Sequence, residues 1–218
     1  MQSKPLILCP LEIERRAAAR TARDRADVIC TGPGPDRMRD ALLNSDLSSR
    51  PCAILYGVAG GLRHTETSPT IAAVVDERAQ IKWTSPMLPK GEGLTIVGVD
   101  DPAFTIERKA ELLNLSDADL VDTESHVFAP ECDAAHIPWA VIRGVSDGPE
   151  TVLLPIMGTW VDEHGKTKTS RVMRDLARRP SLIPRVAEIG SGTRRALASA
   201  ARVLDALLTE HAATIRDA

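Results

Sequence analysis

Two acidic positions near the middle of the chain carry side chains suited to chemistry. One is the stretch Asp122-Thr123-Glu124, and the other is the pair Ser146-Asp147. A carboxylate such as Glu124 can accept hydrogen bonds from the vicinal hydroxyls of a sugar. A second carboxyl group, Asp147, can act as a general acid if burial keeps it protonated. The alternative is that Glu124 caps the following helix and Asp147 starts a turn, and spacing alone favours that alternative.

A glycine-rich turn is the second candidate. The stretch YGVAGGL ends an apolar run at Gly57, Val58, Ala59 and Gly60. A ligand can approach the backbone closely where no Cβ stands in the way, and exposed N–H groups there can hold oxygen atoms. Glycine turns are also common for purely conformational reasons, so this stretch alone does not decide between the two roles.

These candidate residues follow short apolar runs that alternate with helical patterns. KPLILCPL, PCAILYGVAGGL and IPWAVIRGVSD are typical of buried strands, and EIERRAAARTARDRA is typical of a helix. This alternation predicts an α/β fold with a mostly parallel sheet. Since such sheets bind ligands at the carboxyl ends of their strands, we expect Glu124 and Asp147 at the ends of two neighbouring strands.

Length, composition and net charge indicate the number of domains and the kind of partner. The chain has 218 residues, of which 43% are hydrophobic and 26% charged, and we expect a single domain over residues 1–218. A helical segment is expected at about residues 167–213. The net charge of −3 argues against a nucleic-acid partner.

Cysteine spacing and the length of the apolar runs indicate whether the chain binds a metal and where in the cell it works. The four cysteines are scattered, and no cysteine–histidine cluster has the spacing of a metal site, so no metal is expected. The cysteines favour a reduced, cytoplasmic setting. We expect no signal peptide, because the N-terminus has no positively charged stretch that leads into a long apolar run. We expect no transmembrane segment, because no uninterrupted apolar stretch is long enough to span a bilayer.

The order of several motifs resembles one known family. Glu14 in PLEIE is followed by GVAGGL, then VDTES, then VIRGVSD. This order resembles the nucleoside phosphorylase/nucleosidase superfamily, which includes purine and uridine phosphorylases and 5′-methylthioadenosine nucleosidase. The resemblance spans nearly the whole chain. ESH after VDT, and the tail LARRPSLIPRVAEIGSGTRRALASAARVL, look closest to the hopanoid-associated phosphorylase branch, which implies release of adenine from adenosylhopane.

The resemblance implies a fold and a role for each motif. It implies a three-layer α/β/α sandwich with a central mixed, mostly parallel sheet. Asp147 would protonate the leaving purine with Ser146 orienting its carboxyl group, Glu124 would bind the ribose hydroxyls, and Glu14 would be the general base toward water. The glycine turn would line the site, and Phe104 would be a wall for adenine, although a lone Phe is more often a core residue. None of these roles needs a metal or cofactor.

The chain departs from the family at the phosphate-binding positions. Phosphorylases of this family carry an Arg just before the glycine turn and a Ser inside it, where this chain has Leu55 and Val58. A phosphate dianion needs charge-assisted donors, so the sequence favours water over phosphate as the co-substrate. Arg143 is a remaining candidate donor, and it could equally pair with Glu124. Thr123 stands where the family usually has a Met that packs against the ribose.

A lipid substrate would need an apolar opening beyond the 5′ carbon. Six residues are candidates for lining it, and they could equally be core or an oligomer interface: Leu11, Leu153, Leu154, Ile156, Met157 and Trp160. The basic run over residues 166–185 fits either a solvated helix face or peripheral contact with anionic lipid. The resemblance also implies a homo-oligomer.

Three functional hypotheses remain open from the sequence. The first is a purine nucleosidase for an adenosine that carries a large apolar 5′ group. The second keeps the enzyme but gives it a small nucleoside such as 5′-methylthioadenosine. The third is a non-catalytic nucleoside-binding module, which would have no need of a proton donor such as Asp147.

Overall fold

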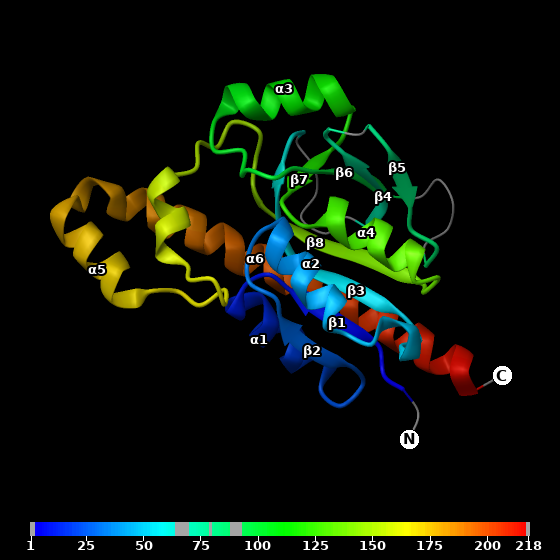
Figure 1. Ribbon diagram of the computed structural model, residues 1–218. Coiled ribbons are helices and arrows are strands. Elements are labelled where there is room, and N and C mark those ends of the chain that lie inside the picture. The colour runs from blue at the N-terminus through cyan, green and yellow to red at the C-terminus, as the bar shows by residue number, and fades with distance from the viewer. Residues whose placement is uncertain (1–2, 64–69, 79, 88–92, 217–218) are drawn as a thin grey trace.

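The computed structural model describes residues 3–63, 70–78, 80–87 and 93–216 (Figure 1). The strands are β1 (Leu6–Cys9), β2 (Asp27–Cys30), β3 (Ala53–Gly61), β4 (Thr70–Asp76), β5 (Lys82–Thr84), β6 (Leu94–Gly98), β7 (Leu120–Asp122) and β8 (Trp139–Asp147). The α-helices are α1 (Glu12–Ala22), α2 (Pro35–Leu43), α3 (Ile106–Ser116), α4 (Ser125–Ala134), α5 (Thr169–Arg178) and α6 (Ile183–Arg216). Three short 3₁₀ turns are η1 (Leu47–Ser49), η2 (Pro155–Trp160) and η3 (Pro180–Leu182).

The strands form one mixed sheet. β1 pairs in parallel with β2 and β3, β3 with β8, and β6 with β4 and β7. The antiparallel pairs are β3–β7, β4–β5 and β4–β8. Pairing therefore continues from β3 through β8, β4, β6 and β7 back to β3, so that five strands close into a ring.

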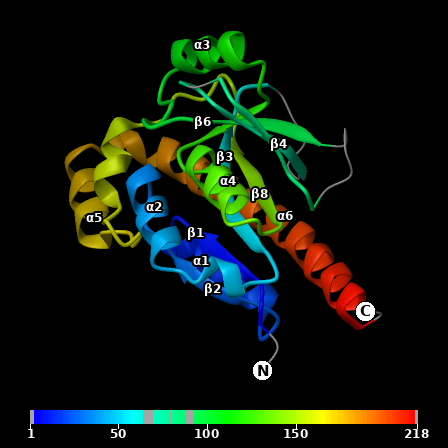
Figure 2. The same cartoon turned by 45° about the vertical axis from the view of Figure 1, so that its right-hand side comes forward.

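Helices cover both faces of the sheet because its strands alternate their side chains between the two faces. In β1, Leu6 and Leu8 face a core shared with α2 and α4, whereas Ile7 and Cys9 face a core shared with α1 and α6. Figure 2 shows α1 and α6 on one side of β1 and β3, and α2 and α4 on the other. The expected α/β/α layering around a mixed, mostly parallel sheet is confirmed.

One expectation about the sheet was wrong. β7, which precedes Glu124, does not pair with β8, which ends at Asp147. The longer strand β3 lies between them, pairing with β8 along most of its length and with β7 at Gly60 and Gly61. The glycine turn thus lies between the two acidic positions, which is the physical reason that all three meet.

The C-terminal part is helical and projects from the sheet. α5 ends at Arg178, two residues before Pro180, as expected from the helix-breaking effect of proline. α5 has no buried residue and extends away from the sheet at the left of Figure 1. The long helix α6 returns across the face formed by β8 and β3. No helix among the described residues is long and apolar enough to cross a membrane.

Candidate functional site

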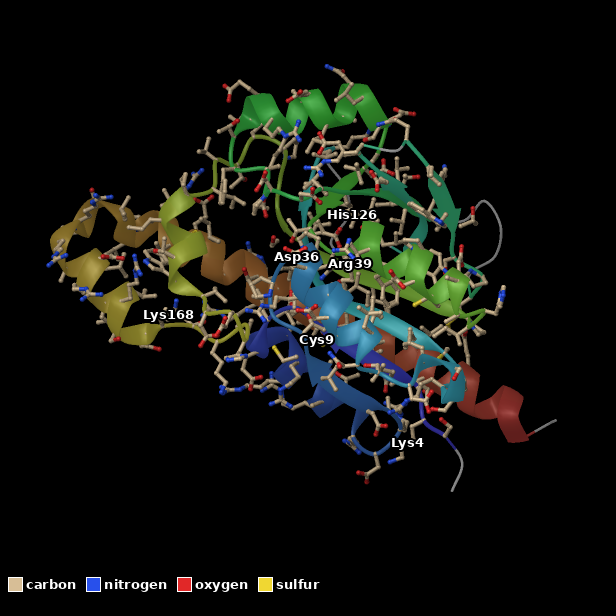
Figure 3. All side chains as sticks on the ribbon, in the orientation of Figure 1. Lys4, Cys9, Asp36, Arg39, His126 and Lys168 are labelled. Carbon is tan, nitrogen blue, oxygen red and sulfur yellow. The ribbon has the colours of Figure 1, made fainter. Side chains whose placement is uncertain are left out.

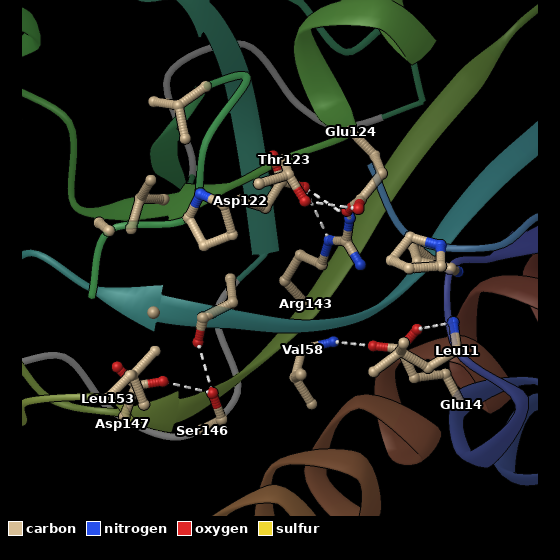
Figure 4. Close-up of a pocket in the computed structure, with 18 of the residues that line it drawn as sticks. Leu11, Glu14, Val58, Asp122, Thr123, Glu124, Arg143, Ser146, Asp147 and Leu153 are labelled. Atoms are coloured by element: carbon tan, nitrogen blue, oxygen red, sulfur yellow. Dashed lines mark hydrogen bonds and ion pairs between the residues drawn. The ribbon is translucent and has the colours of Figure 1, made fainter. Parts of the chain in front are cut away.

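A cavity of about 200 Å³ opens at the carboxyl ends of β1, β3, β7 and β8 (Figure 4). Most of the expected site residues line it: Glu14, Val58, Ala59, Gly60, Thr123, Glu124, Arg143, Ser146 and Asp147. The acidic positions of β7 and β8 and the helix α1 therefore face one common space.

A buried guanidinium group holds the carboxylates at the end of β7. Arg143 on β8 donates from Nε and Nη2 to Asp122 Oδ2 at 2.9 and 2.6 Å, and from Nη2 to Glu124 Oε2 at 2.8 Å. The Arg143 side chain is 1% exposed. Burial opposes its charge, but Asp122, Glu124 and Glu14 together raise the pKa of Arg143 above its ordinary value. Arg143 thus pairs with Glu124, one of the two roles open to it from the sequence.

Glu124 is fixed by further donors. Its Oε1 accepts from the Gly34 backbone N–H at 2.9 Å and from the Thr123 hydroxyl at 2.6 Å. Glu124 is the residue before α4, but its side chain does not cap that helix. Asp122 does so instead, accepting from the Ser125 N–H at 3.1 Å and from its hydroxyl at 2.6 Å. Since Asp122 takes the capping role, the Glu124 carboxylate can face the cavity.

Glu14 is a buried carboxyl group at the opposite end of the cavity from Asp147 in Figure 4. Its Oε1 accepts from the Val58 backbone N–H at 2.9 Å, and its Oε2 accepts from the Leu11 N–H at 2.8 Å. Burial raises the pKa of Glu14 to about 7, against the opposing effect of the Arg143 charge and these two hydrogen bonds. A carboxyl group with this pKa suits a general base near neutral pH.

Asp147 at the end of β8 has two side-chain partners. Ser146 Oγ donates to Asp147 Oδ1 at 2.6 Å, which orients the carboxylate. Lys109 Nζ from α3 donates to Asp147 Oδ2 at 2.5 Å. The Lys109 and Asp147 side chains are 1% and 6% exposed, so this is a buried ion pair.

The glycine turn contributes in two ways. Val58, Ala59 and Gly60 line the cavity directly. Gly57 does not line it but lies behind it, where an added Cβ would be 2.3 Å from Glu14 Oε1 and 2.4 Å from Arg143 Nη1. The position needs glycine because the two charged side chains occupy the space that a side chain would fill.

One other expected residue, Phe104, lies elsewhere. Phe104 is half-buried and is not among the residues that line the cavity; its carbonyl accepts from the Leu153 N–H at 2.9 Å. Its neighbours Pro102 and Ala103 line the cavity instead. His126 lies 3.1 Å from Asp100 Oδ1 and lines a second, more polar cavity together with Asp36 and Arg39 (Figure 3).

The candidate apolar opening is only partly formed by the expected residues. Leu11 and Leu153 line the cavity, whereas Leu154, Ile156 and Met157 do not. Trp160 is buried, and its indole N–H donates to Asp175 in α5 at 2.9 Å. Trp160 therefore attaches α5 to the preceding turn.

Sequence reasoning missed Lys109, although a signal was present. The residue lies three and four positions before Leu112 and Leu113, on the apolar face of α3. A lysine on an apolar helix face needs a buried partner. The Thr105 hydroxyl caps α3 by accepting from the Arg108 N–H, which fixes where the helix begins.

No family model matches the chain, and no curated protein matches it in sequence. Solved structures do match in three dimensions. The 5′-methylthioadenosine/S-adenosylhomocysteine nucleosidase of Helicobacter pylori has a TM-score of 0.65 and 13% identity, with 96% of this chain and 99% of that chain covered. The chain shares the fold of that nucleosidase.

Two further structures have the same fold. Futalosine hydrolase of H. pylori has a TM-score of 0.65 at 13% identity, over 95% of this chain and 99% of that chain. The Campylobacter jejuni 5′-methylthioadenosine/S-adenosylhomocysteine nucleosidase has a TM-score of 0.59 at 13% identity, over 95% and 97%. The motif resemblance to the nucleoside phosphorylase/nucleosidase superfamily is therefore accompanied by a common fold.

The arrangement separates two kinds of chemistry along one cavity. Glu14 can take a proton at one end, and Asp147, with Ser146 and Lys109, can exchange one at the other. Among the described residues, no group of three or more His, Cys, Asp or Glu side chains is arranged to hold a metal ion. Glu14 and Asp147 can supply acid–base chemistry, and the charged groups around them can supply electrostatic stabilisation.

Proposed function

We propose that this protein cleaves the N-glycosidic bond of a purine nucleoside and releases adenine. The observation that carries the proposal is that a buried Glu14 with a pKa of about 7 and the Ser146–Asp147 pair line the same cavity. Breaking an N-glycosidic bond places positive charge on the ribose and negative charge on the base. Carboxylates beside the sugar and a proton source beside the base offset both charges, and each positioned acid or base contributes roughly 10²–10⁴-fold.

Glu124 fits the role of ribose ligand. A carboxylate has about four lone-pair positions, and three are occupied by Gly34, Thr123 and Arg143. One ribose hydroxyl can therefore bind without displacing a donor. Thr123 stands where the family usually has a Met. Its hydroxyl donates to Glu124 Oε1 and so helps to orient the carboxylate.

Water is the nucleophile in this proposal. Leu55 is fully buried in the core, and Val58 presents an apolar side chain to the cavity. Arg143 is engaged with Asp122 and Glu124. A phosphate dianion would find no unpaired cationic donor in this group and would face the carboxyl group of Glu14, so hydrolysis is favoured over phosphorolysis.

The proposed substrate is an adenosine with an apolar 5′ group, adenosylhopane being the candidate that the sequence resemblance supplies. Leu11 and Leu153 give the cavity an apolar part suited to such a group. The second candidate is a small nucleoside such as 5′-methylthioadenosine, since structures sharing the fold are nucleosidases of that compound.

We also propose peripheral contact with anionic lipid through α5 and assembly into a homo-oligomer. α5 exposes Met173 and several arginines, and Ile183 beyond it is half-exposed. Exposed apolar and basic side chains on one projecting helix suit a lipid surface, each basic residue contributing about 1 kcal/mol. Binding to vesicles with and without phosphatidylserine, compared between the wild-type protein and Met173→Asp, tests this contact; equal binding by both proteins would contradict it.

The enzymatic proposal is tested with a panel of adenine nucleosides of increasing 5′ apolarity. The protein is incubated with each nucleoside, with and without phosphate, and the free base and sugar are identified by mass spectrometry. We expect adenine and free sugar in both conditions, at rates that rise with 5′ apolarity. Absence of adenine from every nucleoside would refute the activity, and sugar 1-phosphate formed only with phosphate would refute hydrolysis.

A further inference from the structure

A buried ion pair forms part of the cavity wall at the end of β8. Lys109 lies in the first turn of α3, and its ammonium reaches Asp147 at the end of β8. Both residues line the cavity, yet their side chains are only 1% and 6% exposed. Two charges so far from water are stable only when their hydrogen-bonding capacity is satisfied.

That capacity is satisfied on the lysine side. Lys109 Nζ donates to Asp147 Oδ2, to the Gly148 carbonyl at 2.7 Å and to the Thr151 carbonyl at 3.2 Å. An ammonium has three N–H donors, so each of them has an acceptor. The Lys109 ammonium therefore has a partner for every N–H.

The carboxylate side is satisfied as well. Asp147 Oδ2 accepts from Lys109, and Oδ1 accepts from the Ser146 hydroxyl at 2.6 Å. Both carboxylate oxygens of Asp147 therefore act as acceptors. A carboxylate that accepts on both oxygens has no proton of its own to give to a leaving base, so the proton must come from a neighbour.

We propose that Lys109 supplies the proton that Asp147 passes to the leaving base. The inference rests on the proposed glycosidic cleavage and names the proton source for it. As the C–N bond breaks, its electron pair moves onto the base, and a base nitrogen takes a proton from Asp147. Asp147 in turn takes a proton from Lys109 Nζ, leaving a neutral amine and a carboxylate.

The proton balance closes within the site. Glu14 takes one proton from the attacking water, whose oxygen forms the new bond to the sugar carbon. Once the products have left, that proton is lost to solvent, and the Lys109 amine takes one up from solvent. Lys109 touches Asp147 and not the reacting atoms, so it acts as a positioning residue.

Two substrates with different leaving groups distinguish a proton-supplying role of Lys109 from a purely structural one. Adenosine and 4-nitrophenyl β-D-ribofuranoside share the sugar, but nitrophenolate leaves without being protonated. In Lys109→Met we expect kcat for adenosine to fall about 100-fold or more. We expect kcat for the nitrophenyl riboside to stay within about threefold of wild type, and KM to change little for both substrates.

The matched control is Arg108→Met, on the same helix. Arg108 pairs with Glu77 and Glu111 and does not line the cavity. Both substrates should be cleaved by this variant at the wild-type rate. An equal loss on both substrates in Lys109→Met, or no loss on adenosine, would overturn the inference. Failure of the wild-type protein to release adenine from any nucleoside would instead refute the proposed function.

A second variant covers the case in which Lys109→Met does not fold because Asp147 is left unpaired. Lys109→Met combined with Asp147→Asn removes both buried charges. If Lys109 acts through Asp147, the double variant should cleave adenosine at the rate of Asp147→Asn alone. A further loss of tenfold or more in the double variant would show that Lys109 acts independently and would contradict the proposal.

Discussion

At the scale of residues, the site consists of carboxyl groups made different by their surroundings. Glu14 accepts from two backbone N–H groups and has a guanidinium nearby, and burial raises its pKa to about 7. Asp147 is paired directly with an ammonium. Glu124 and Asp122 share one guanidinium. In the proposed mechanism the same chemical group serves as base, proton relay and ligand, because each carboxyl group has a different partner.

Replacing Asp147 tests its assigned role in proton transfer. Asp147→Asn keeps the shape of the side chain and removes the carboxylate oxygen that would take up the proton and pass it on. We expect kcat for adenine release to fall roughly 10²–10⁴-fold, while the dissociation constant for the nucleoside changes little. Steady-state kinetics and calorimetric titration measure the two quantities, and unimpaired turnover would remove the role from Asp147.

Replacing Arg143 tests the buried charge cluster. Arg143→Met leaves Asp122 and Glu124 facing each other without a counter-charge, and we expect the free energy of unfolding to fall by about 3–5 kcal/mol. Arg16→Met is the control, because the Arg16 side chain is 67% exposed in its pair with Glu12. This variant should lose less than about 1 kcal/mol of the free energy of unfolding. Urea unfolding measures both, and equal losses would contradict the account.

The residues that sequence reasoning identified were those with a local signature. Glu124 and Asp147 stand at recognisable strand ends, and both line the cavity. Lys109 and the Gly34 N–H come from segments far away along the chain. Their contributions depend on how the chain folds back, so motif spacing could not place them.

At the scale of elements, β8 and α6 hold one side of the site together. Gly144, next to Arg143 on β8, packs directly against the backbone of α6. The strands themselves were predictable from their apolar runs, but the order was not. β3 separates β7 from β8, and five strands close into a ring. Pairing order depends on contacts between distant segments, which the pattern of one segment does not encode.

A methyl group at position 144 should displace α6. An added Cβ would lie 2.1 Å from the Ala196 carbonyl oxygen, so we expect Gly144→Ala to lower the free energy of unfolding by about 1–3 kcal/mol. The control is Gly190→Ala in α6, where an added Cβ meets nothing within 4 Å. That variant should be neutral or more stable by about 0.5–1 kcal/mol. Denaturant unfolding of both variants measures the two changes. An unchanged free energy of unfolding in Gly144→Ala would contradict the close packing of Gly144 against α6.

At the scale of the whole molecule, the burial of Glu14 lowers the free energy of unfolding once the pH exceeds about 4.5. Its pKa is about 7 in the folded protein against an ordinary value of 4.5, so the folded state holds a proton that the unfolded state has already lost. The contribution of Glu14 to stability therefore falls as the pH rises from about 4.5 through 7.

Variants of two glutamates in α1 measure how much free energy of unfolding is lost by burying Glu14. Between pH 5 and pH 8, the stability of Glu14→Gln relative to wild type should rise by up to about 3 kcal/mol, since the variant lacks the titrating group. Glu12→Gln is the control, because arginine hydrogen bonds lower the pKa of Glu12 to about 2 and leave it ionised throughout this range. Urea unfolding at both pH values checks the difference, and a constant difference for Glu14→Gln would refute the raised pKa.

Hydrolysis of a purine nucleoside with Glu14 as the base determines how adenine release depends on pH in phosphate-free buffer. For the wild-type protein, kcat/KM should rise with pH and reach half its maximum near pH 7, as Glu14 loses its proton. In Glu14→Gln that rise should disappear, with the remaining rate roughly 10²–10⁴-fold lower. Adenine release by Glu14→Gln at the wild-type rate, or no release by the wild-type protein at any pH, would contradict the account.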